Sequence, residues 1–132
     1  MDHHAIALAA SAVLLLGAAS AAPAFAGDQA SRTILDRIAV AGTAKEAVIG
    51  LGEAKAGGSI GAHSHPGEEL AYVISGTLTL KVKGKPGRSL HAGDSYTLPS
   101  GTVHELVGGK GDSRVVVVWV VDKAKPLSTP AP

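Results

Sequence analysis

Four side chains that can bind a metal ion lie in two short segments of the sequence, and they are His63, His65, Glu69 and His104. Imidazole nitrogens together with a carboxylate oxygen suit the divalent ions of Fe, Mn, Ni, Cu and Zn, and geometry and metal supply decide among these ions. Four such ligands leave coordination positions open for other molecules. The four residues therefore predict a centre for one divalent transition metal.

The local spacing predicts how three of these ligands meet. Side chains two residues apart lie on one face of a β-strand, about 6.6 Å apart along it, so His63 and His65 project together. The turn at Pro66-Gly67 redirects the chain, after which Glu69 begins a neighbouring strand. Because Glu68 would point to the opposite face of that strand, we expect Glu69 to be the carboxylate ligand.

The elements that must position these ligands are short strands. Residues 77–83 alternate polar and apolar side chains, as a half-buried strand does, and residues 84–87 form a strong turn after them. A tight turn at Pro99-Ser100-Gly101 delivers His104 onto a later strand. After residue 26 there is no sustained period of 3.6 residues. This pattern predicts an all-β fold, built as an antiparallel sandwich or barrel.

Residues 115–121 read Val-Val-Val-Val-Trp-Val-Val and predict a strand that is apolar on both faces. One face can fill the interior of a barrel, whereas the other would be an exposed, β-rich strip unless something covers it. We expect a second copy of the chain to cover this strip in a homodimer. The alternative is a further layer of the same chain.

The first part of the sequence has the pattern of a targeting segment. Residues 5–22 are almost wholly apolar, and Ala24-Phe25-Ala26 matches the small-x-small pattern of a cleavage site. We expect a signal peptide over residues 1–26, cleaved after Ala26, and a mature chain in the periplasm or outside the cell, without stable membrane insertion. Residues 2–4 lack the usual basic side chains, so an upstream start or an uncleaved anchor stays open as an alternative.

The remaining sequence predicts one domain. The expected divisions are an N-terminal extension over residues 27–44, a β-barrel over residues 45–122 and a flexible tail over residues 123–132. Within the extension, residues 33–40 are apolar enough for a first strand. The sequence has no cysteine, which excludes disulfides and thiolate chemistry. Without Asp2, the sequence has 12 Lys and Arg residues and 10 Asp and Glu residues. This small positive net charge does not indicate nucleic acid as a partner.

Both metal-binding segments resemble the hallmark motifs of the cupin family of small β-barrels. The first motif places Gly, His-x-His, Glu and Gly at fixed spacings, and it is matched by Gly57, His63, His65, Glu69 and Gly76. The second motif is matched by Gly93, Pro99, Gly101 and His104, although Gly108 stands where Asn is usual. The resemblance covers about residues 45–122. It implies a single cupin barrel of the jelly-roll type and the same four metal ligands.

The resemblance implies a function less specifically, because one fold hosts many activities. Cupin dioxygenases and secreted oxalate-oxidising cupins use such a metal to act on small, oxygen-rich molecules, so we expect a metal-dependent oxidoreductase with a small-molecule substrate. A metal-dependent isomerase or decarboxylase is a variant of this hypothesis. The alternative is a non-catalytic module that binds the metal or a small ligand. No catalytic residue beyond the ligands is evident, and nothing in the sequence places Arg88 or Arg114 near the metal.

Overall fold

The computed structural model describes residues 29–132, and these residues form ten β-strands and no helix. No helix that could cross a membrane therefore occurs among them. The expected signal peptide, with its cleavage after Ala26, lies outside the described residues. The strands are β1 (Ala30–Ala39), β2 (Lys45–Ala54), β3 (His63–Ser64), β4 (Gly67–Ser75), β5 (Thr77–Val82), β6 (Arg88–His91), β7 (Ser95–Leu98), β8 (His104–Gly108), β9 (Ser113–Asp122) and β10 (Thr129–Pro130).

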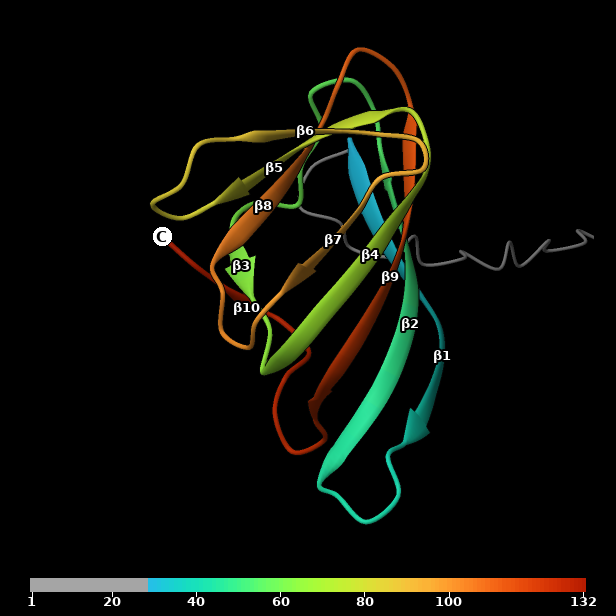
Figure 1. Ribbon diagram of the computed structural model, residues 1–132, viewed down its shortest axis with the longest axis vertical. Coiled ribbons are helices and arrows are strands. Elements are labelled where there is room, and N and C mark those ends of the chain that lie inside the picture. Colours follow the sequence, from blue (N-terminus) through green and yellow to red (C-terminus); the bar gives the residue numbers. More distant parts are fainter. Residues whose placement is uncertain (1–28) are drawn as a thin grey trace, which may run out of the picture.

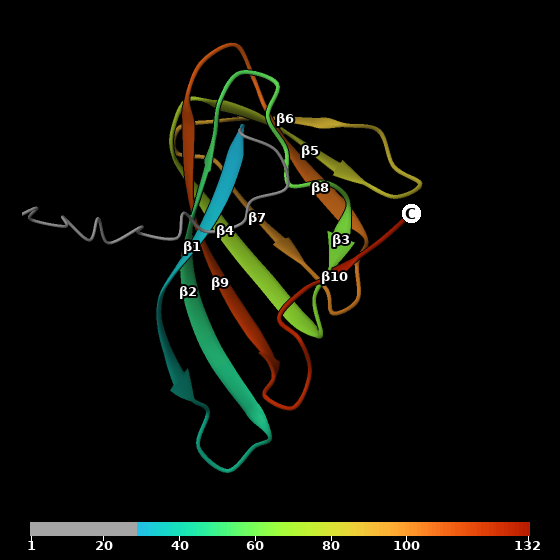
Figure 2. The same ribbon diagram turned by 180° about the vertical axis from the view of Figure 1, so that it is seen from behind.

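The strands form two five-stranded sheets with antiparallel pairing throughout. One sheet has the order β1-β2-β9-β4-β7 and the other has the order β10-β3-β8-β5-β6. Figure 1 shows the second sheet lying against the upper part of the first, while β1 and β2 extend beyond it, and Figure 2 shows the same arrangement from behind. The predicted all-β, antiparallel barrel is therefore confirmed.

The core lies between the two sheets, and β9 shows how the sequence fills it. Along this central strand, Val115, Val117, Trp119 and Val121 are all buried, and the residues between them are half-buried. The predicted strand over residues 77–83 is also found, as β5, with Leu78 and Leu80 buried in the same core. Alternate side chains of a strand point to opposite faces, so this burial pattern follows from the backbone geometry.

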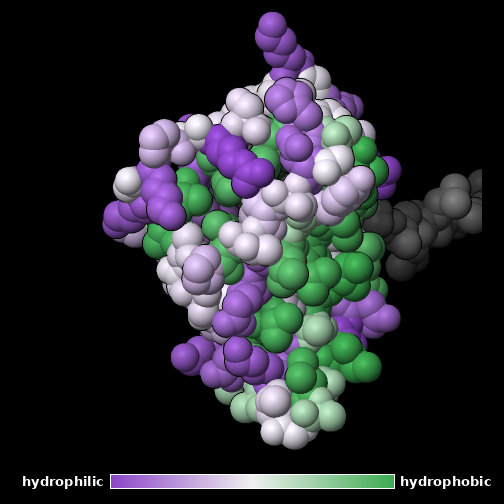
Figure 3. Space-filling view, in the orientation of Figure 1, coloured by the Kyte–Doolittle hydropathy of each residue, from purple (hydrophilic) through white to green (hydrophobic). Residues whose placement is uncertain are grey.

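The outer face of the first sheet exposes large apolar side chains. Ile49 on β2 and Leu70, Tyr72 and Ile74 on β4 are between 36% and 51% exposed. Leu70 and Ile49 both lie opposite Val118 of β9, so these side chains form one continuous surface. Figure 3 shows apolar side chains gathered over β4, β9 and β2. We call this set of side chains the outer apolar face.

The segment before the expected barrel is part of the first sheet. Strand β1 pairs with β2 from Ala30 to Ala39, with a bulge between Ile34 and Asp36. The first strand predicted over residues 33–40 is thus found, and it begins three residues earlier. Residues 30–39 of the expected extension are therefore held in the sheet by antiparallel backbone pairing, as the other strands are.

The last residues include a short strand within the segment where we expect a flexible tail. Strand β10 pairs with β3, where Thr129 lies opposite Ser64 and Pro130 opposite His63. Leu127 packs against the hydrophobic core. The Pro- and Ala-rich composition of the tail did not indicate these contacts, because they involve only one apolar side chain and a two-residue pairing.

Candidate metal centre

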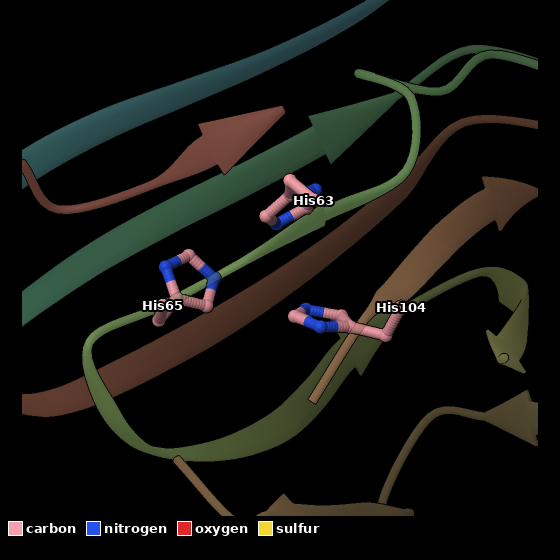
Figure 4. Close-up of side chains that lie close together, drawn as sticks. All are labelled: His63, His65 and His104. Carbon is pink, nitrogen blue, oxygen red and sulfur yellow. The ribbon is translucent and has the colours of Figure 1, made fainter. Parts of the chain in front are cut away.

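Three histidines from the two predicted segments converge between the sheets. His63 lies on β3, directly opposite His104 at the start of β8, and His65 follows two residues after His63. Their rings point into one space in Figure 4, and one ligand nitrogen from each lies within 4.8 Å of the other two. All three side chains are at most 9% exposed. This arrangement could hold a metal ion.

Each imidazole is fixed by a backbone carbonyl on its Nδ1 side. The distances from Nδ1 to the carbonyl oxygen are 2.8 Å for His63 to Gly61, 2.7 Å for His65 to Leu127 and 2.9 Å for His104 to Thr102. Nδ1–H is the donor in such a bond, so in each neutral ring the lone pair is on Nε2. Metal-binding histidines in proteins are oriented in the same way by a partner on their other nitrogen.

A hydrogen bond from the turn before His104 links the two ligand segments. The backbone N–H of Gly101 donates to the carbonyl oxygen of His65 at 3.0 Å. Gly101 has a φ of +77°, in the left-handed region where a residue with a side chain would be strained. The glycine of the second segment therefore fixes the distance between His65 and the strand that carries His104.

Glu69 lies beside the histidines and is held by two aromatic side chains. Its Oε2 is 2.8 Å from Nε2 of His65 and 3.2 Å from Nε2 of His104. The hydroxyl of Tyr96 donates to Oε1 at 2.6 Å, and Nε1–H of Trp119 donates to Oε2 at 2.9 Å. Glu69 is 3% exposed, whereas Glu68 faces solvent and pairs with Lys45, as the strand alternation predicts.

The charges of this cluster are coupled. Burial acts to raise the pKa of Glu69, but the neighbouring His104, His65 and Tyr96 side chains stabilise the carboxylate and hold its pKa below the ordinary range. Burial also acts against protonation of His104, but Glu69 outweighs it and raises the pKa of His104. Burial lowers the pKa of His63. The cluster therefore contains a buried carboxylate that the side chains around it stabilise in its charged form.

The donor set fits a metal ion. His65 stabilises the Glu69 carboxylate only when its Nε2 bears a proton; with Nδ1–H donating to Leu127, a neutral His65 has a lone pair at Nε2, 2.8 Å from Oε2, which is repulsive unless a cation lies between the two atoms. This Nε2 atom is fully buried and has no aligned hydrogen bond among residues 29–132. Ligands at right angles on bonds of about 2.1 Å lie about 3 Å apart, close to both contacts of Glu69. Ligation by all four residues stays a prediction, and the structure brings them together.

A pocket opens next to the cluster and reaches to β1. It is partly open to solvent, and His63, Glu69 and His104 lie in its wall. Gly52 on β2 lies in this wall, and a Cβ there would lie 2.9 Å from Val115, whereas a Cβ at Gly50 would lie 2.7 Å from the Trp119 ring. Most of the remaining wall is apolar. A small molecule in this pocket would lie against the histidines.

Several residues of the site were not predicted from the sequence. Tyr96 and Trp119 pack in the core, and their polar atoms also hold Glu69, which no local pattern indicates. The carbonyl of Leu127 is 62 residues from His65 in the chain, and no local pattern indicates such a contact. Arg88 donates to the backbone of Ser95, outside the pocket wall.

Comparison with known proteins identifies the fold. Residues 50–121 match the family model of the cupin domain. The structure of the DMSP lyase DddQ from Ruegeria pomeroyi is similar, with a TM-score of 0.66 and 23% identity, covering 79% of this chain and 52% of the lyase. This chain thus spans about half the length of that lyase. No curated protein matches the chain in sequence.

Two further structures show the same architecture. A double-stranded β-helix protein from Klebsiella pneumoniae has a TM-score of 0.63 and 24% identity, covering 77% of this chain and 86% of the other. An oxalate oxidase in complex with glycolate has a TM-score of 0.61 and 23% identity, covering 77% of this chain and 55% of the other. At these identities the likeness concerns the fold. Because the family model spans more than half of the sequence, the chain belongs to the cupin superfamily.

Proposed function

We propose that this cupin is a metal-dependent enzyme, an oxidoreductase of the dioxygenase type that acts on a small, oxygen-rich molecule. The observation that carries the proposal is the pocket, because His63, Glu69 and His104 form part of its wall beside an otherwise apolar lining. A ligand can therefore reach the ion that these residues would hold. The fold is compatible with such chemistry, since its structural neighbours include an oxalate oxidase and a lyase.

Different residues of the chain have different roles at the proposed metal centre. His63, His65, His104 and Glu69 would hold the ion, and the backbone carbonyls of Gly61, Leu127 and Thr102 orient the three imidazoles. A redox-active ion with one anionic ligand keeps net positive charge, so it attracts an anionic oxygen of the substrate and supplies electron transfer to O2. The mostly apolar wall would limit the number of water molecules beside the ion, which would strengthen these charge interactions.

A second function is favoured by one observation, the lack of an unengaged acid or base in the pocket. Among residues 29–132, the one carboxylate in its wall besides Glu69 is Glu53, which pairs with Arg114 at 3.3 Å. A cupin without such a group could bind the metal, or a small ligand through the metal, without turnover. This second candidate is a binding module.

Elemental analysis and oxygen uptake distinguish the two functions. The protein is purified, its metal is determined, and O2 consumption is measured with diketones, catechols, flavonols and oxalate after loading with Fe(II), Mn(II), Ni(II), Cu(II) or Zn(II). For an oxidoreductase we expect substrate-dependent O2 loss with Fe, Mn or Cu, and none in the His63→Ala variant. Tightly held Zn without turnover on any substrate would support the binding module and refute the enzyme.

The outer apolar face suggests the oligomeric state. We infer that a second copy of the chain covers Ile49, Leu70, Tyr72 and Ile74, because monomeric proteins rarely expose contiguous apolar patches of this kind. Light scattering coupled to size-exclusion chromatography would give twice the mass of one chain. A single-chain mass at micromolar concentration would refute the homodimer.

The expected signal peptide places the mature protein in the periplasm or outside the cell. Expression of the complete sequence in a Gram-negative host, followed by fractionation and N-terminal sequencing, tests this proposal. We expect a mature chain beginning at Gly27 in the periplasmic fraction. An intact N-terminus in the cytosolic fraction would contradict it.

A further inference from the structure

Arg32 lies in the wall of the pocket, on a strand of the other sheet from β3 and β8. It is on β1, opposite Gly52 of β2, and both residues lie in the pocket wall. Its guanidinium carbon lies 5.5 Å from the centre of the Trp119 ring. Burial lowers the pKa of the guanidinium, although nearby Glu69 partly offsets this effect. The chain thus places a desolvated cation beside the same tryptophan that holds Glu69.

This cation has no counter-ion among residues 29–132. Nη2 of Arg32 donates to Oγ of Ser128 at 3.2 Å, but Nη1 is fully buried and has no hydrogen-bond acceptor there. The two carboxylates in the pocket wall are engaged elsewhere, Glu69 with the histidines and Glu53 with Arg114. Arg32 as a whole is half-buried, and a buried guanidinium nitrogen without an acceptor is costly, so the arrangement favours an anion from outside the chain.

A comparison with other arginines shows why the missing ion pair of Arg32 is informative. Arg37, on the same strand, faces solvent and still pairs with Glu46 at 3.3 Å. Arg114 pairs with Glu53 at the surface. Two of the three exposed arginines among residues 29–132, Arg37 and Arg114, thus have carboxylate partners although a surface ion pair contributes little, whereas half-buried Arg32 has none.

We propose that Arg32 is the anion-binding residue of this pocket and that its ligand is a small carboxylate with an apolar body. The planar guanidinium can bind a carboxylate through two parallel N–H···O bonds. The body of the ligand would lie against the apolar wall, formed in part by Leu78, Leu106 and Val115. The proposal rests on the proposed function only in that the other end of the ligand faces the metal centre. Carboxylate recognition by Arg32 does not itself require the metal.

The sequence contains a single tryptophan, and it is the residue next to Arg32, so its fluorescence reports on this pocket. The full chain, stripped of metal with EDTA, is titrated with propionate, butyrate and isovalerate, and in parallel with the neutral amide of each acid. Acid and amide have nearly the same shape, so a difference in their affinities reports the charge. We expect each acid to bind at least about tenfold more tightly than its amide.

Two variants assign this preference to one side chain. Arg32→Gln should weaken acid binding by about ten- to a hundredfold and leave amide binding unchanged, because only the charge-assisted bonds are lost. Arg37→Gln is the matched control on the same strand, and it should bind both ligands as the wild type does. If Arg32→Gln does not fold, Arg32→Lys keeps the charge without the planar fork and should show a reduced preference for the acid.

Each outcome decides the proposal. Equal affinity of acid and amide for the wild-type protein, binding of neither up to their solubility limits, or an acid preference that survives in Arg32→Gln would overturn it. Oxygen uptake and metal content test the proposed oxidoreductase separately. A protein that prefers acids through Arg32 but never consumes O2 would support the anion site and refute the enzyme, and turnover without any acid preference would do the reverse.

Discussion

The two faces of β9 have nearly the same composition and entirely different surroundings. On the inner face, Val115, Val117, Trp119 and Val121 are at most 4% exposed. On the outer face, the three intervening valines are half-buried and lie beside the exposed Leu70 and Ile49. Apolar composition alone therefore does not separate a core from a surface that awaits a partner. The neighbouring strands decide which face is which.

The two faces of the sheet also differ in the environment of their polar atoms. The inner face encloses Glu69, whose oxygens receive hydrogen bonds from Tyr96 and Trp119. The chain's other tyrosine, Tyr72, lies on the outer face and is 51% exposed. Buried polar groups are costly unless they are satisfied, so the inner face can carry a charged site only because aromatic donors surround it.

Removing a ligand from the inner face should have the largest effect. In His104→Ala, one of the three converging nitrogens is lost, and we expect metal affinity to fall by more than about a hundredfold, beyond the loss caused by removing an outer partner. Competition with a chromogenic chelator measures the affinity. His91→Ala is the control, because the His91 side chain is 68% exposed and lies outside the cluster. Equal losses in both variants would contradict the site.

The two tyrosines give a second comparison between the faces. Tyr96→Phe removes the hydroxyl that holds Oε1 of Glu69, so we expect metal affinity to fall by about ten- to a hundredfold with little change in core packing. Tyr72→Phe removes the same hydroxyl from the outer face and should leave metal affinity unchanged. An unaltered affinity in Tyr96→Phe would mean that Glu69 needs no such support.

Adjacent valines of β9 compare the faces in terms of stability. Val117→Thr places a hydroxyl in the core and should lower the free energy of unfolding by about 1–3 kcal/mol. Val118→Thr places it on the outer apolar face, where a monomer would lose no more than about 0.5 kcal/mol. Urea unfolding of each variant, at concentrations that keep the protein monomeric, measures the difference. Equal losses would show that the outer face is covered within a single chain.

A charge on the outer apolar face should affect the fold least. Leu70 is 44% exposed, so Leu70→Lys should leave metal content unchanged while it dissociates the proposed homodimer. Light scattering gives the mass of the variant. Ser89→Lys adds the same charge to an exposed position of β6, in the other sheet, and should leave the dimer intact. A dimer that persists in Leu70→Lys would place the interface elsewhere.

The sequence predicted those parts of the molecule that rest on local spacing. Alternation along residues 77–83 and 115–121 identified β5 and β9, and the spacing of His63, His65 and Glu69 predicted that they share one interior. The same rule placed Glu68 on the solvent side. In each case the period of a β-strand is enough to decide where a side chain points.

The parts that could not be predicted depend on long-range contacts. Trp119 meets Glu69 across 50 residues, and Arg32 meets Ser128 across 96. Strand β1 is patterned only weakly, because most of its residues are exposed on both sides. A residue whose role is set by a partner so distant in sequence leaves no periodic signal. These contacts supply the surroundings of the ligands, which spacing alone does not describe.

The bond between His65 and the carbonyl of Leu127 has a consequence for biosynthesis. A ribosome adds Leu127 long after His65, so a growing polypeptide has its first histidine pair well before the acceptor that fixes one of them. Metal loading should therefore follow the emergence of residues near 127, and a translation product arrested before that point would retain its ion poorly. The final assembly step of the centre would then be set by the order of synthesis.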